Sequence, residues 1–167
     1  HPMLGHPSVP LLPAALAAGE TLGATGKDVL LAYVVGFETQ VKIGRGVNPE
    51  HYRLGWHATS TLGTMGAAAA SARLFGLNIE ETRMTLGLAA SQACGLRQNF
   101  GTMTKPFHPG NAARSGVLAA RLAKKGFTAD AGILASRTVI LLDDVVTTGS
   151  TAAEAARTLL AARAVSV

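Results

Sequence analysis

The feature that most constrains the fold is a set of segments whose helical faces consist of glycine and alanine. The stretch ATSTLGTMGAAAASARLFG, residues 58–76, places Gly63, Gly66, Ala67 and Ala70 on one face of a predicted helix. Side chains this small let another helix approach closely. With 48% hydrophobic residues, 19 glycines and 5% aromatics, the 167-residue chain is expected to have an ordered interior of closely packed helices.

Hydrophobic periodicity predicts five helices in the first 134 residues. The first begins at Ser8, which is expected to cap it, and ends before Gly23. The second runs from residue 27 to about residue 44. The third is the small-faced segment, and the fourth begins at Asn78, is closed by Gly95, and has Glu81 placed to complete a capping box.

The fifth predicted helix runs from Asn111 to Lys125, with a small face of its own formed by Ala112, Gly116, Ala119 and Ala123. Polar loops are expected at residues 47–57 and 95–110, where Pro and Gly interrupt the periodicity. Cys94, the single cysteine, is expected to be a small buried residue, and a catalytic thiol is the alternative interpretation.

The pattern changes near Ala135. Residues 137–144, RTVILLDD, form a short apolar run typical of a buried parallel strand, and a helical pattern follows the turn after it. The predicted fold is therefore mainly α: a bundle-like helical region over residues 1–134, incomplete as a domain, joined to a strand-turn-helix (βα) unit over residues 136–167.

Charge and hydropathy narrow the function classes. The net charge is +5, but the fifteen Lys and Arg residues are scattered without a basic stripe, which argues against nucleic acid and fits an anionic small molecule. No apolar run is long enough to span a bilayer, and the first residues lack the pattern of a signal peptide. We expect a cytoplasmic protein without a membrane partner.

Four histidines lie in or beside the predicted loops. A zinc site is one interpretation, but no carboxylate or thiol accompanies them at ligand spacing, so no metal is expected. They could instead cap helices or hydrogen-bond to loops. A third interpretation places them with Lys105 in an acid–base site for a polycarboxylate, with helix N-termini adding positive potential. The histidines are His6, His51, His57 and His108.

Several motifs in the right order resemble the MmgE/PrpD family, which includes 2-methylcitrate dehydratase and cis-aconitate decarboxylase. They span residues 1–134 and include HPSVPLLPAALAAGE, AYVVGFE, HYRLGWHATSTLGTMGAAAASARLFGL, TLGLAASQACGL and GTMTKPFHPGNAARSGVLAARLAKKGFTA. The resemblance implies a helical catalytic domain that performs proton abstraction with elimination, or decarboxylation, on tricarboxylate-like substrates. It implies no cofactor and a homodimeric assembly.

The same resemblance assigns the catalytic roles to His6, His57 and Lys105. An ammonium group can hold a substrate carboxylate, and an imidazole can move a proton near neutral pH. Weaker candidates for substrate binding are His51, Thr59, Thr102 and His108. Family members also carry an acidic stretch before the HPS motif and a second α/β domain, and without these we expect impaired activity.

The stretch VILLDDVVTTGST, residues 139–151, resembles the PRPP-binding signature of type I phosphoribosyltransferases. The turn can offer N–H and hydroxyl groups to a phosphate, and the carboxylates can accept hydrogen bonds from ribose hydroxyls. An alternative function is thus binding of PRPP or a ribose phosphate with Mg²⁺; a further alternative is a chimeric chain with no activity. The residues are Asp143, Asp144, Thr147, Thr148, Gly149, Ser150 and Thr151.

Overall fold

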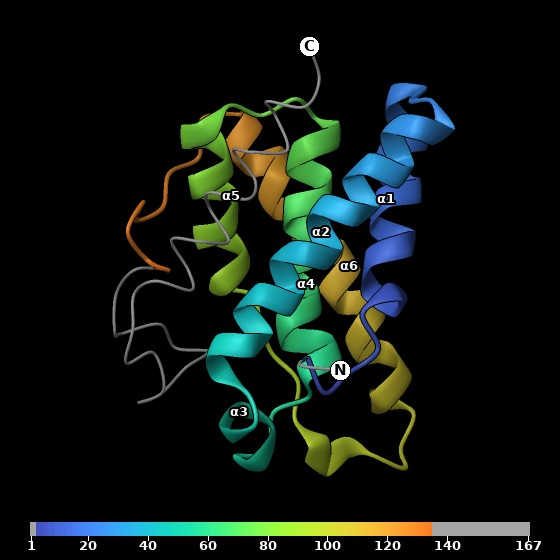
Figure 1. Cartoon of the computed structure of the whole chain (residues 1–167), viewed down its shortest axis with the longest axis vertical. Helices are drawn as coiled ribbons and strands as arrows, with labels where there is room; N and C mark the ends of the chain where they lie inside the picture. The colour runs from blue at the N-terminus through green and yellow to red at the C-terminus, as the bar shows by residue number, and fades with distance from the viewer. Residues whose placement is uncertain (1–2, 135–167) are drawn as a thin grey trace.

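The structure, a computed structural model, describes residues 3–134, and these form a helical bundle (Figure 1). No strand occurs among these residues, which agrees with the mainly helical fold predicted for them from the sequence. The elements in chain order are α1 (Ser8–Leu22), α2 (Gly26–Val47), α3 (Glu50–Arg53), α4 (Ala58–Leu74), α5 (Ile79–Ala90), the 3₁₀ turn η1 (Arg97–Asn99) and α6 (Thr104–Lys124).

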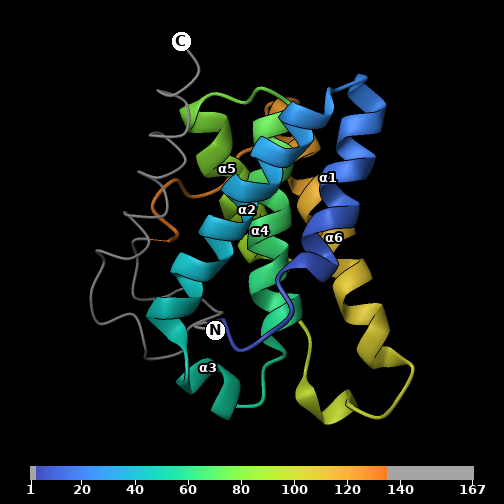
Figure 2. The ribbon, with the colours of Figure 1, turned by 45° about the vertical axis from the view of Figure 1, so that its right-hand side comes forward.

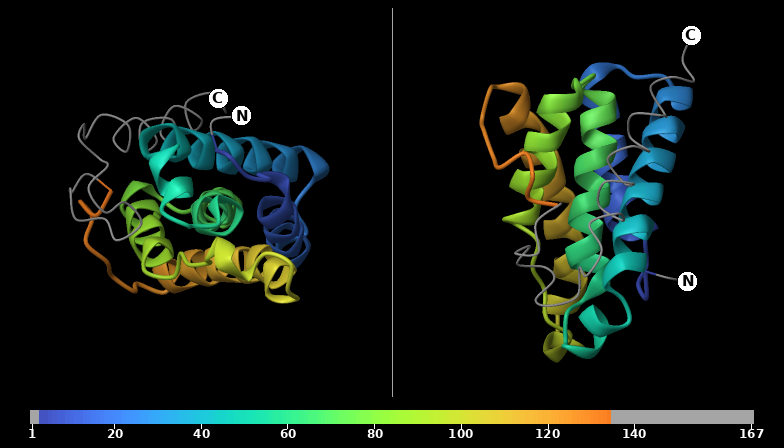
Figure 3. Two further views of the ribbon diagram at one scale, coloured as in Figure 1. Left: turned by 90° about the horizontal axis from the view of Figure 1, so that it is seen from below. Right: turned by 60° about the vertical axis from the view of Figure 1, so that its left-hand side comes forward.

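Helix α4 is the centre of the bundle. Seen along the bundle axis, it is surrounded by α1, α2, α5 and α6 (Figure 3, left), and it packs against all four. Every residue from 58 to 72 is buried. The sequence predicted one small face for this helix, whereas small and hydroxyl-bearing side chains surround it on every side, which is typical of a fully buried helix.

Several polar side chains of α4 are compatible with burial because they bond within the protein. The Thr64 hydroxyl donates to the Ser60 carbonyl at 2.9 Å, and the Ser60 hydroxyl donates to the carbonyl of His108 on α6 at 3.3 Å. A buried hydroxyl without a partner costs about 1–3 kcal/mol. These bonds remove that cost and leave the helix able to pack closely on all sides.

Glycines set the closest approaches between the helices. A Cβ atom on Gly116 of α6 would lie 2.5 Å from Ala67 Cβ and 2.6 Å from the Ala68 backbone nitrogen. A Cβ on Gly36 of α2 would lie 2.5 Å from the carbonyl oxygen of Gly66. Distances this short involve backbone atoms that cannot rotate away, so both contacts require glycine.

Several helix ends agree with the sequence and others do not. The capping box of Asn78 and Glu81 is confirmed, and Gly23 ends α1 in the left-handed conformation. The predicted cap at Ser8 is wrong, because Ser8 lies inside α1 and its hydroxyl bonds to Tyr33 instead. Cys94 is exposed rather than buried, because α5 ends at Ala90 and the chain then runs along the surface.

Helix α6 begins earlier than the sequence predicted, and this difference matters most for function. The sequence placed residues 95–110 in a loop, but α6 begins at Thr104 and includes two prolines. Pro106 lies in the first turn, where a missing N–H removes no intrahelical bond, and Pro109 is accommodated further on. Lys105 and His108 therefore lie three residues apart on one helix rather than in a loop.

The predicted βα unit at residues 136–167, including its strand, turn and helix, lies outside the described residues. In residues 3–134, no helix combines the length and the apolar character that a bilayer crossing requires.

Two glycines of α6 test how strongly the packing depends on close approach. Gly116→Ala is expected to lower the free energy of unfolding by about 1–3 kcal/mol, because the added methyl group meets the backbone of α4. Gly110→Ala is the matched control: a Cβ there meets nothing within 4 Å, so better helix propensity should raise stability by up to about 1 kcal/mol. Chemical denaturation measures both, and equal effects would contradict this account of the α4–α6 contact.

Candidate active site

Three helices begin at one end of the bundle and bring the candidate residues together (Figure 2). His57 is the N-cap residue of α4, Lys105 is in the first turn of α6, and His6 comes just before α1. Helix N-termini carry partial positive charge and unpaired N–H groups. The shared end of α1, α4 and α6 is therefore suited to negatively charged ligands.

His57 and His108 form the centre of this cluster. Their Nδ1 atoms are 2.9 Å apart and share a hydrogen bond, although the residues are 51 positions apart in the chain. Both side chains are buried, with His57 4% and His108 6% exposed. The sequence assigned His57 a catalytic role and His108 a weaker, substrate-binding one; the structure brings them into direct contact.

Phe100 links the histidine pair to Lys105. Its ring lies edge-on to the His57 imidazole, with centroids 4.8 Å apart, and the Lys105 ammonium lies 4.6 Å from the centre of the same ring. The lysine side chain is exposed. A cation above an aromatic face is held without an ion pair, so the ammonium can still bind a carboxylate.

The segment that carries His6 is fastened by two helices. The His6 backbone N–H donates to Thr59 Oγ1 at 3.0 Å, and the amide of Gln40 on α2 donates to the Pro7 carbonyl at 3.1 Å. Asn48, at the end of α2, donates to the Met3 carbonyl at 2.8 Å. Thr59 was a substrate-binding candidate, but in this structure its side-chain oxygen is a hydrogen-bond acceptor that positions His6.

Two other candidates also bond within the protein. His51 is buried, with its Nε2 atom 2.7 Å from Thr61 Oγ1 and its ring stacked on Trp56. The Thr102 hydroxyl donates to the Asn99 carbonyl and accepts from the Thr104 N–H, so it supports the start of α6. Thr61 Oγ1 also donates to the His57 carbonyl at 3.4 Å, so His51 is linked to the backbone of His57 through Thr61.

The surroundings of His57 favour its neutral form. Burial lowers the pKa of His57 to about 4, and the nearby His108, Lys105 and His6 add electrostatic repulsion of a proton. Burial also lowers the pKa of His108. At neutral pH the pair is uncharged, and a neutral imidazole has one nitrogen that can accept a proton.

The described residues offer no metal centre. Among residues 3–134, no group of three His, Cys, Asp or Glu side chains is arranged to hold a metal ion. The ribose-phosphate candidates from Asp143 to Thr151 lie outside the described residues, so their role stays a prediction.

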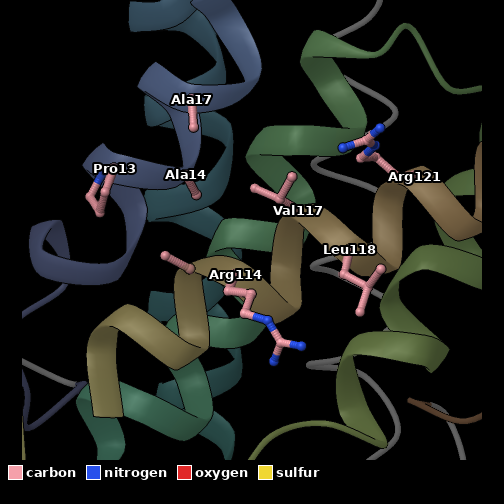
Figure 4. A pocket seen from close by; sticks show the side chains of 8 residues that line it. Pro13, Ala14, Ala17, Arg114, Val117, Leu118 and Arg121 are labelled. Atoms are coloured by element: carbon pink, nitrogen blue, oxygen red, sulfur yellow. The ribbon is translucent and has the colours of Figure 1, made fainter. Parts of the chain in front are cut away.

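A groove of about 410 Å³ lies elsewhere, between α1 and α6 (Figure 4). Its walls are mostly apolar, with Arg114 and Arg121 from α6 at its edge, and none of the predicted catalytic residues lines it. The groove is separate from the histidine cluster.

Sequence reasoning missed the supporting residues Gln40, Ser60 and Phe100. Gln40 and Ser60 occur within helical patterns and are fully or almost fully buried. A glutamine on an otherwise apolar helix face was the available signal for Gln40, since a buried amide requires partners. Nothing in the local pattern distinguishes Phe100 from a packing residue.

The low pKa of His57 predicts how stability depends on pH. The unfolded chain takes up a proton at this residue below about pH 6.5, whereas the folded chain does so only below about pH 4. Between these values the unfolded state binds more protons, so the free energy of unfolding should fall by roughly 3 kcal/mol as the pH is lowered from 6.5 to 4. Chemical denaturation of the chain and of His57→Asn across this range measures the effect; the variant should lose less stability on acidification, and equal losses would contradict the prediction.

Comparison with known proteins supports the family resemblance. The chain matches the MmgE/PrpD N-terminal domain over residues 1–155, a range that runs past the domain boundary predicted near Ala135. It is 38% identical over 136 residues to the cis-aconitate decarboxylases of Aspergillus terreus and Homo sapiens, an alignment that covers 77% of this chain and 28% of each relative. A cis-aconitate decarboxylase-like protein, oryM, from Aspergillus oryzae is 37% identical over 131 residues, with 73% of this chain and 27% of the relative covered. The chain spans little more than a quarter of the length of these relatives, and it belongs to the MmgE/PrpD family through that family's N-terminal domain.

Proposed function

We propose that this chain binds a tricarboxylate of the cis-aconitate type and carries proton-transfer groups of a lyase. The observation that carries the proposal is the meeting of His57, His108, Lys105 and the His6 segment where three helices begin. The similarity to cis-aconitate decarboxylases names the substrate class. The reaction is decarboxylation or, as in 2-methylcitrate dehydratase, elimination of water.

The electrostatics of the cluster support an anionic substrate. The charged and titratable groups that act on His57 are His108, Lys105 and His6, and all three are basic side chains, which are neutral or positively charged. The beginnings of α4 and α6 add the partial positive charge of their backbone N–H groups. A substrate with several carboxylates gains favourable interactions with the ammonium of Lys105 and with both helix ends.

The neutral histidines support proton transfer at carbon. Elimination requires a base to remove a proton beside a carboxylate, and decarboxylation requires an acid to protonate the carbanion that remains when CO₂ leaves. An imidazole can perform either step near neutral pH. In this proposal His57 transfers the proton, Lys105 binds a carboxylate, and His6 lies at the edge of the site.

The proposed chemistry uses side chains alone and needs no cofactor. Binding of PRPP or a ribose phosphate with Mg²⁺ through Asp143 and Asp144 has no supporting observation among residues 3–134. Dimer formation also remains a prediction from the family resemblance.

Ligand-dependent stability tests the substrate class. Cis-aconitate and 2-methylcitrate should raise the unfolding midpoint of the 167-residue chain, because a ligand that binds only the folded state stabilises it. At 100 times Kd the stabilisation is about 2.7 kcal/mol. A neutral triester of cis-aconitate, which lacks the negative charges, should leave the midpoint unchanged.

Lys105→Ala should abolish most of this ligand-induced shift. Lys125→Ala, at the opposite end of α6, is the matched control and should retain it. Release of CO₂ from cis-aconitate and loss of water from 2-methylcitrate are then assayed with the same proteins. If neither acid shifts the midpoint, or if both variants respond alike, the proposed role of this site is wrong.

A further inference from the structure

The hydrogen bond between His57 and His108 joins two atoms of the same kind. Each Nδ1 can donate when it bears a proton and accept when it does not. A separation of 2.9 Å between them therefore requires one proton in the contact, bound to one ring and accepted by the other. If both Nδ1 atoms were protonated, two donors would face each other. If neither were protonated, two lone pairs would face each other.

The backbones of both histidines are held in place from outside the pair. The His57 backbone N–H donates to the Gly95 carbonyl at 2.9 Å, and the His108 carbonyl accepts from the Ser60 hydroxyl. Gly95 adopts a φ of 126°, and a Cβ on it would lie 2.9 Å from the Ser60 side chain and 3.4 Å from His108 Cγ. The segment after α5 thus packs directly onto the pair and limits ring movement.

The groups around the pair disfavour the charged form of either ring, in which both ring nitrogens are protonated. His6, from the segment before α1, and Lys105, from α6, both act on His57 electrostatically. His51, on α3, is bonded to Thr61. Among residues 3–134, no carboxylate lies within hydrogen-bonding distance of either ring to stabilise an imidazolium. The pair consequently has two protons in total, one on each imidazole.

We propose that His108 is a positioning residue for His57, and that the two imidazoles hold opposite tautomers through the Nδ1–Nδ1 hydrogen bond. One ring then bears its proton on Nδ1 and leaves Nε2 free to accept a proton. The other ring bears its proton on Nε2, where it can donate. The pair presents one base and one acid at neutral pH without charging either ring.

This inference deepens the proposed function and rests on it for its catalytic consequence. Elimination needs a free imidazole nitrogen, and decarboxylation needs an N–H that can protonate carbon. Without His108, the Nδ1 atom of His57 would lose its hydrogen-bond partner, and the His57 ring would be less firmly held in a position to transfer a proton. The tautomers themselves can be observed whether or not the chain turns over a substrate.

The first experiment is nuclear magnetic resonance of the full chain with ¹⁵N-labelled histidine at pH 7. Nitrogen shifts distinguish protonated from unprotonated ring nitrogens. We expect one of the two imidazoles with a protonated Nδ1 and the other with a protonated Nε2, and a scalar coupling between the two Nδ1 nuclei across the hydrogen bond. That coupling identifies the pair without any variant. The same tautomer in both rings, or no coupling, would overturn the proposal.

Two substitutions then separate positioning from mere packing. The amide of His108→Asn can reach the place of Nδ1 and bond to His57, whereas the side chain of His108→Leu cannot. The Nδ1 atom of His57 should stay hydrogen-bonded with Asn, whose amide can donate or accept, and should lose that hydrogen bond with Leu. His6→Asn is the control and should leave the tautomer of His57 unchanged.

Turnover provides the catalytic readout. With cis-aconitate or 2-methylcitrate, His108→Leu should lower kcat by about 100-fold with little change in KM, and His108→Asn should restore most of the loss. Equal loss in both variants would show that His108 does more than position His57, and would contradict the proposal. Opposite tautomers in a chain whose unfolding midpoint neither acid shifts would uphold the inference and reject the proposed function.

Discussion

The complete burial of α4 is the constraint on which the rest of the structure depends. A helix surrounded by four others must present a mostly small surface, and α4 does so with alanine, glycine, serine and threonine, with Leu62 and Met65 as its large buried side chains. The neighbouring helices meet it with their own small residues, such as Gly36 and Gly116. Because backbones lie this close, helix positions are set by contacts between main-chain atoms, with little freedom for side chains to adjust.

That constraint also fixes the candidate active site. The N-terminal end of α4 carries His57, Thr59 and Ser60. His57 and Ser60 both bond to His108 of α6, through its ring and its carbonyl, and Thr59 bonds to the His6 segment. The site is therefore an extension of the core and not a set of surface loops. Its buried histidines have low pKa values because the core that positions them also excludes water.

Much of the helical fold could be predicted from the sequence, because glycine and alanine at helical spacing report close packing directly. The start of α6 could not be predicted, because prolines such as Pro106 and Pro109 indicate a loop unless their positions within a helix are known. The candidate site was predictable only in part. His57 and Lys105 followed from the family motif, but the partnership of His57 with His108 depends on how α4 and α6 pack, which local spacing does not encode.

Because the His6 segment is held by two helices, the geometry of the candidate site depends on the spacing between those helices. Gln40 of α2 holds the Pro7 carbonyl, and Thr59 of α4 holds the His6 N–H, so the reach from His6 to His57 follows the α2–α4 distance. At the same contact, a Cβ on Gly66 would lie 2.9 Å from the Gln40 side-chain oxygen. A methyl group added deep in the bundle would thus displace His6 relative to His57 while every side chain of the candidate site stayed unchanged.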